Sequence, residues 1–76
     1  MRPQEFDVIR LLRPLPEHDL PAGFRGTVVM DYSKGANANL PPAYEVEFAD
    51  ADGITRALVT FTEHDLEVVW RPTSGS

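Results

Sequence analysis

Ala43-Tyr44-Glu45-Val46-Glu47-Phe48 is the stretch of sequence that decides the fold. Its large apolar residues alternate strictly with glutamates, which is the period of a β-strand with one buried and one solvated face. Asp52-Gly53 follows shortly afterwards, and this dipeptide forms a tight hairpin turn at low energetic cost. We therefore expect a β-hairpin in which residues 54–61 return beside residues 43–48.

Three further segments, residues 6–12, 26–32 and 67–70, are short and rich in β-branched and aliphatic residues, as strands are. Residues 13–25 contain three prolines and should form a long irregular loop, because proline cannot donate to a sheet ladder. Its apolar members should fold over an open end of the sheet: Leu15, Leu20 and Phe24. Residues 33–42 have the composition of a mobile loop.

Thr62-Glu63-His64-Asp65 is expected to form a single 3₁₀ turn that begins at a threonine cap. Five short strands with one such turn before the last predict an all-β protein, a small five-stranded SH3-like barrel. We expect an N-terminal arm over residues 1–5, the barrel over 6–70 and a flexible polar tail over 71–76.

The predicted core follows from the alternation within each strand. In residues 26–32, one face should carry Val28, Met30 and Tyr32 into the core. The remaining core positions are expected to be Tyr44, Val46, Phe48, Val68 and either Ala57 or Leu58.

Length and composition limit the possible classes of protein. The chain has 76 residues, of which 42% are apolar and 25% charged, so it is expected to form one ordinary globular domain. It contains no cysteine, which excludes disulfides and thiolate zinc sites. No segment has the apolar length of a signal peptide or a membrane span, so we expect a cytoplasmic protein that does not contact a membrane.

The charge distribution indicates the kind of partner. Seven basic residues against twelve acidic ones leave a net charge of −5, which makes nucleic acid an unfavourable ligand. The acids concentrate in one segment that has no base between Lys34 and Arg56. We expect the partner to be a protein with a basic surface, and we predict that it binds Glu45, Glu47, Asp50, Asp52 and Trp70. Trp70 is expected either to complete the core or to anchor this complex.

The tetrapeptide Glu-His-Asp-Leu occurs twice, at residues 17–20 and 63–66, and contains both histidines. If the two loops met in space, His18 and His64 with a carboxylate could bind zinc, iron or nickel. We favour the alternative that both copies are polar turns whose leucine fills the core, and we predict no metal site. No serine, threonine or cysteine is placed beside a base as nucleophilic catalysis requires. We therefore predict neither an enzyme nor a cofactor.

Six segments within residues 6–70 share a pattern with known proteins: Asp7-Val8-Ile9-Arg10-Leu11-Leu12, Leu15-Pro16-Glu17, Leu20-Pro21-Ala22-Gly23, Gly26-Thr27-Val28-Val29, Ala43-Tyr44-Glu45-Val46-Glu47-Phe48 and Asp65-Leu66-Glu67. Through these segments the chain resembles a family of small bacterial proteins known as domain of unknown function 4926. The resemblance implies an SH3-like barrel that accompanies the products of neighbouring genes, some of them toxin-like, and it brings no catalytic residue. The loop at 33–42 is longer than the family pattern.

These features leave three classes of function open. The first is a non-catalytic binding module, an antitoxin-like or immunity-like protein that neutralises a partner encoded nearby. The second is an accessory or subunit domain of an enzyme, because the chain also resembles the SH3-like domain of the nitrile hydratase β subunit. The third is RNA binding, because Gly26-Thr27-Val28-Val29 resembles the glycine turn of KOW modules and Arg10, Arg13 and Arg25 could line one edge.

Overall fold

The structure is a computed structural model and describes residues 2–32 and 42–72. In this described part of the chain, two short 3₁₀ turns accompany the strands, η1 at Pro16–His18 and η3 at Glu63–Asp65. The five strands are β1 Val8–Leu11, β2 Arg25–Asp31, β3 Tyr44–Ala49, β4 Thr55–Phe61 and β5 Leu66–Trp70. Within the described residues there is no helix of the length and apolarity that a membrane span requires.

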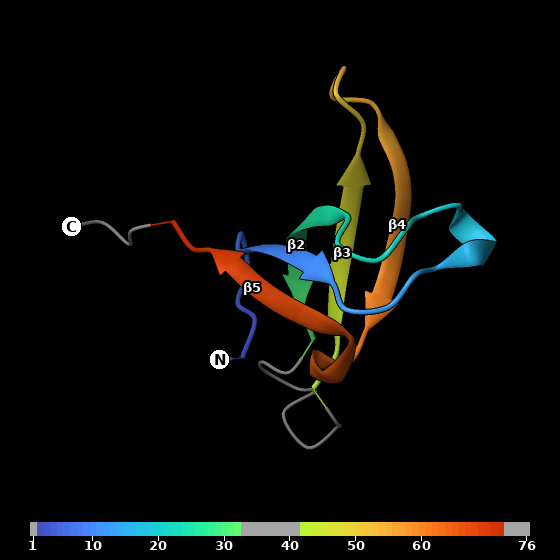
Figure 1. Cartoon of the computed structure of the whole chain (residues 1–76). Helices are drawn as coiled ribbons and strands as arrows, with labels where there is room; N and C mark the ends of the chain where they lie inside the picture. The colour runs from blue at the N-terminus through green and yellow to red at the C-terminus, as the bar shows by residue number, and fades with distance from the viewer. Residues whose placement is uncertain (1, 33–41, 73–76) are drawn as a thin grey trace.

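The strands form one antiparallel sheet in the order β4-β3-β2-β1-β5. The predicted hairpin is confirmed, because β3 pairs with β4 and Gly53 takes the positive φ of 79° that the turn needs. The 3₁₀ turn before the last strand is also confirmed. In Figure 1 β5 runs across β2 and β3, so the sheet is strongly twisted. The all-β prediction is therefore confirmed, and closure into an SH3-like barrel stays a prediction.

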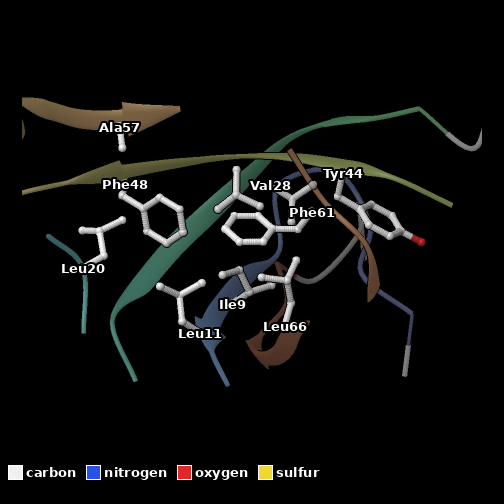
Figure 2. Close-up of a cluster of buried hydrophobic side chains, with 10 residues drawn as sticks. Ile9, Leu11, Leu20, Val28, Tyr44, Phe48, Ala57, Phe61 and Leu66 are labelled. Carbon is white, nitrogen blue, oxygen red and sulfur yellow. The ribbon is translucent and has the colours of Figure 1, made fainter. Parts of the chain in front are cut away.

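The core lies on the inner face of this sheet, where the alternating residues of β3 meet side chains from every other strand (Figure 2). The predicted inward positions Tyr44, Val46, Phe48 and Val28 are fully buried, and Ala57 takes the inward place on β4. The ring of Phe48 contacts two others, with centroid distances of 6.1 Å to Phe24 and 5.9 Å to Phe61. Edge-on and tilted contacts of this kind add to the stability gained from burial.

The proline-rich loop covers one end of the sheet, as predicted. Leu20 is buried, and Leu15 and Phe24 pack against the core. Backbone hydrogen bonds between Leu15 and Leu20 close the loop around η1. The prediction of a mobile loop at residues 33–42 falls almost entirely on residues outside the described part of the chain.

Met30 contradicts the predicted core, because it is 44% exposed instead of packing beside Val28. The cause is a β-bulge. The β2–β3 register shifts between Val28 and Met30, so that Val28 lies opposite Val46 whereas Met30 lies opposite the outward-facing Glu45. One extra residue in a strand reverses the face on which the following side chains lie.

Asp7 is the one charged residue in the core of the described chain, with only 1% of its surface exposed. Arg71 donates to it twice, from Nε at 2.9 Å and from the second guanidinium nitrogen at 2.6 Å. The backbone N–H of Gln4 donates to the same carboxylate at 2.8 Å. Arg71 also donates to the carbonyl of Arg2, so this one carboxylate fastens the N-terminal arm to the chain beyond β5.

The surroundings of Asp7 lower its pKa. Burial acts in the opposite direction and would raise the pKa, but the hydrogen bonds from Arg71 and Gln4 and the charge of Arg71 outweigh it. The same pairing raises the pKa of Arg71. The pair is therefore ionised and fully formed near neutral pH.

Gly26 allows β2 to approach β3 closely. A Cβ atom at this position would lie 2.7 Å from Cε1 of Phe48 and 2.7 Å from Cγ1 of Val46. Both of those side chains are fully buried. Because neither can withdraw into solvent, the absence of a side chain at position 26 is a packing requirement.

We predict that Gly26→Ala lowers the free energy of unfolding by about 1–3 kcal/mol, which is the usual cost of overpacking a core. Urea unfolding followed by circular dichroism measures this. Thr27→Ala, on the outer face of the same strand, is the matched control and should change stability by less than about 0.5 kcal/mol. In a Phe48→Leu background the cost of Gly26→Ala should shrink, and an unchanged cost would show that the ring is not the obstacle.

We predict that Asp7→Asn lowers the free energy of unfolding by about 2 kcal/mol at pH 7, because it weakens charge-assisted hydrogen bonds in a buried site. The folded protein holds the pKa of Asp7 below its ordinary value. The contribution is therefore complete above about pH 4, the ordinary pKa, and disappears as the pH falls through the lower folded value. Wild type and variant should then converge in acid. Asp52→Asn, which removes an exposed charge, is the control, and an equal effect there would contradict the prediction.

Candidate functional site

The outer face of β3 carries the two glutamates that the alternation predicted. Glu45 lies opposite Met30 on β2 and Thr60 on β4, and Glu47 lies opposite Leu58 on β4. Leu58 is 53% exposed. We call this surface the outer acidic face and define it by Met30, Glu45, Glu47 and Leu58. It combines two half-buried carboxylates with two large apolar side chains in contact with solvent.

Hydrogen bonds hold both carboxylates in place without neutralising them. Thr55 Oγ1 donates to Glu47 Oε2 at 3.0 Å. Burial, and after it the charge and hydrogen bonding of Glu45, raise the pKa of the Tyr32 phenol. Tyr32, directly after β2, therefore lies beside the outward-facing Glu45, and its predicted place in the core is wrong. The register shift that turns Met30 outward also turns Tyr32 outward. Within residues 2–32 and 42–72, neither glutamate forms an ion pair with a lysine or arginine.

Asp50 and Asp52 lie in the turn beyond β3 and differ in their roles. Asp50 Oδ1 accepts hydrogen bonds from the backbone N–H groups of Asp52, at 2.9 Å, and Ile54, at 3.1 Å. This is the usual task of an aspartate at the start of a turn. Asp52 is exposed. The hairpin thus adds negative charge next to the outer acidic face, but the carboxylate of Asp50 also serves the turn.

Trp70 is 58% exposed, so the expectation that it completes the core is wrong. A second β-bulge is the reason. The β1–β5 register shifts between Val8 and Ile9, so that Val68 lies opposite the buried Ile9 and Trp70 lies opposite Val8. Val68 packs against the core, and the extra residue Val69 turns Trp70 to the other face. Its exposure leaves the second expectation open, that it anchors a complex.

The histidines lie in the two 3₁₀ turns, His18 in η1 and His64 in η3. The leucine that ends each repeat, Leu20 or Leu66, is buried in the core, as the turn interpretation predicted. The described residues contain no group of three histidine, aspartate or glutamate side chains with the spacing of a metal site.

Two of the three arginines considered for RNA binding lie with acidic side chains. Arg10 forms an ion pair with Glu67, 3.0 Å away, across the β1–β5 pairing. Arg25 lies opposite Arg10 on β2. Arg13 lies at a separate hollow of about 270 Å³, together with two acids, Glu17 and Asp65. Acidic side chains therefore accompany Arg10 and Arg13, as the net charge of −5 leads one to expect.

The fold and this surface define a small all-β domain that exposes acidic and large apolar side chains together on the outside of its sheet. The sequence matches the family described as Domain of unknown function (DUF4926) over residues 5–68. The chain therefore belongs to that family, as the resemblance implied. No curated protein and no solved structure matches it.

Sequence reasoning found the glutamates and missed their apolar neighbours. The alternation predicts Met30 in the core and leaves Leu58 as an alternative to Ala57 there. The predicted polar tail includes Arg71, although Arg71 binds the buried Asp7. The outward orientation of Leu58 could have been predicted from the register of the hairpin. A hairpin centred on Asp52-Gly53 places Leu58 opposite Glu47, whose side chain faces solvent.

We predict that Glu45→Gln lowers the pKa of Tyr32 toward its ordinary value. The substitution removes the negative charge and the carboxylate acceptor, while the contribution of burial remains, so the shift should be partial. Phenolate absorbance at high pH measures it in a Tyr44→Phe background, where Tyr32 is the only tyrosine. Glu17→Gln, which removes an equal charge elsewhere, should leave the pKa unchanged. A full return to the ordinary value would contradict the contribution of burial.

Proposed function

We propose that this chain is a non-catalytic protein-binding module that neutralises a partner encoded by a neighbouring gene, in the manner of an antitoxin or immunity protein. The proposal rests on one observation, the outer acidic face. There Glu45 and Glu47 stand between the exposed side chains of Met30 and Leu58. The partner surface is basic, with apolar side chains around the cations.

The physical basis is the combination of charge and apolar area. Carboxylates accelerate encounter with a basic surface and reject acidic competitors. Exposed apolar side chains supply the area whose burial slows dissociation. Glu45 and Glu47 are the members of this face that can select a partner by its charge, because Met30 and Leu58 attract any apolar surface.

The position of the face also supports the proposal. Its carboxylates point away from the core, so they are free to contact another molecule without loss of packing inside the domain. β3 is paired on both sides, with β2 and with β4, which fixes the backbone that carries both glutamates. A rigid platform of this kind loses little conformational entropy on binding.

We predict that the double variant Glu45→Lys, Glu47→Lys weakens binding to the partner by about 2–5 kcal/mol if the two side chains lie at the centre of the interface. The measurement is co-purification with the product of the adjacent gene, followed by calorimetry and by rescue of growth where that product is toxic. The variant should fold normally, because both side chains face outward.

The matched control is Glu5→Lys, Glu17→Lys, which changes the net charge equally at two exposed positions outside the outer acidic face. It should retain affinity and rescue. Equal losses in both variants would indicate an effect of overall charge and contradict the proposed site. A neighbouring product that is an enzyme subunit, and whose activity requires this chain, would replace the proposed function with that of an accessory domain.

A further inference from the structure

Two exposed aromatic side chains lie at β1 and β5, apart from the outer acidic face. Trp70 on β5 is 58% exposed, and Phe6, just before β1, is 60% exposed. The inner side chains of β1 and β5 pack across the core against those of β3 and β4 (Figure 2). The outer sides of these two pairs of strands therefore face different directions, and the aromatic side chains need an explanation of their own.

A hollow of about 280 Å³ lies next to Trp70, and it is lined by Gln4, Glu5, Phe6, Asp7, Arg71 and Pro72. Arg71 turns inward and donates to Asp7 at 2.6 Å. Trp70 and Pro72, on either side of Arg71 in the sequence, therefore project the opposite way. Trp70 thus stands beside the hollow on the same side as Pro72. The volume is near the lower end for ligand pockets, which suits a single large side chain.

The walls of the hollow are fastened to each other. Arg71 binds the carboxylate of Asp7 and also donates to the carbonyl of Arg2 at 2.9 Å. The backbone N–H of Gln4 donates to the same carboxylate at 2.8 Å. In Figure 1 the N-terminal arm accordingly lies beside the end of β5. The hollow is therefore preformed, and filling it costs little conformational entropy.

Phe6, which forms one wall, has a strained backbone. Its φ is 74°, a region that bulky residues rarely adopt. Its N–H donates to the carbonyl of Val28 at 2.7 Å, which holds the backbone in this conformation. The fold thus keeps a strained residue and leaves its ring exposed to solvent. Strained residues cluster at functional sites, so the ring is a candidate contact.

We propose that this surface joins two copies of the chain, with the indole of Trp70 of each copy seated in the hollow of the other. A ring that projects beside a hollow makes a surface self-complementary. A two-fold axis between the two features places each ring opposite the hollow of the second copy, so the contact is closed and association stops at the dimer. Phe6 then contacts the incoming indole, as aromatic pairs favour.

The polar groups of the hollow match this occupant. A buried indole needs an acceptor for its N–H. Within the described residues, neither the indole of Trp70 nor the carboxylate of Glu5 takes part in a hydrogen bond or an ion pair. Glu5 at the hollow accepts the indole N–H of the second copy. The charge of Arg71 is balanced by Asp7, so the remaining charge of the hollow is negative and favours a donor over an acidic side chain.

This inference does not rest on the proposed function. The dimer leaves the outer acidic face of both copies open, because that face lies on β2, β3 and β4. A variant that remains a monomer should therefore bind the product of the adjacent gene with unchanged affinity per chain.

The test is the molar mass of the full chain as a function of concentration, measured by sedimentation equilibrium. The mass should rise from that of one chain to that of two and no further. The emission of Trp70, the only tryptophan, should shift to shorter wavelength over the same concentrations, because the indole leaves water. A chain that stays monomeric up to about 1 mM overturns the proposal.

Variants of Trp70 and Glu5 test the seated indole. Trp70→Ala should raise the dissociation constant of the dimer at least about tenfold. Trp70→Phe keeps a ring and loses the N–H, so it should raise the constant about three- to tenfold. Glu5→Ala should have a similar effect alone and add little to Trp70→Phe, because both remove the same hydrogen bond.

Phe6→Gly separates a contact across the dimer from a role in folding. Glycine adopts a φ of 74° without strain, so the midpoint of urea unfolding should not fall at a concentration where both proteins are monomers. The dissociation constant of the dimer should nevertheless rise about three- to tenfold. A lower midpoint together with an unchanged dimer would show that the ring serves the fold and overturn its place in the interface.

Leu58→Ala is the matched control, because it removes an exposed leucine from the outer acidic face. It should leave the dissociation constant of the dimer unchanged, and circular dichroism confirms that each variant is folded. The proposal is overturned if Trp70→Ala dimerises as the wild type does, or if the dimer forms without a change in the emission of Trp70. It is also overturned if Leu58→Ala weakens the dimer as much as Trp70→Ala.

Discussion

The close approach of the Gly26 backbone to the ring of Phe48 is the constraint on which the rest of the structure depends. Phe48 is fully buried and contacts both Phe24 from the proline-rich loop and Phe61 from β4. One ring thus connects the loop, β2, β3 and β4, and a side chain at position 26 would separate them. The domain has no disulfide to compensate for a loosened core. Packing at this point therefore carries a large share of what holds the small sheet together.

The second determinant is the set of bulges, because they decide which side chains leave the core. One in the β2–β3 pairing turns Met30 outward, and one in the β1–β5 pairing does the same for Trp70. A third, between Phe48 and Ala49 in the β3–β4 pairing, places Thr55 opposite Ala49, and Thr55 donates to Glu47. The strand segments that build the core keep regular alternation. The bulges lie beside these segments, and they turn large side chains such as Met30 and Trp70 to the outer surface.

This division explains what the sequence could predict. Strict alternation in residues 43–48 and the Asp52-Gly53 turn specify a hairpin and its inward residues by local rules, and these predictions are confirmed. A bulge is a single extra residue with no compositional signal, so alternation assigned Met30 to the wrong face and could not decide the face of Trp70.

The Asp7–Arg71 pair joins residues 64 apart in sequence, and only the folded chain shows that this aspartate is buried. The glutamates of the candidate site were found because they belong to the most regular strand.

The separation of the two faces has a consequence for how the domain can change. Residues of the inner face are coupled through shared packing, so a substitution there affects folding before it affects binding. Side chains of the outer acidic face contact solvent and touch the core only through the backbone of strands that are fixed from the other side. Their identity is therefore constrained weakly by stability. A small domain that nevertheless exposes a tryptophan on β5 and a leucine on β4 gives up apolar burial that its core could have used. Contact with a partner supplies a physical reason for that arrangement, because burial in a complex recovers the apolar area that folding leaves exposed.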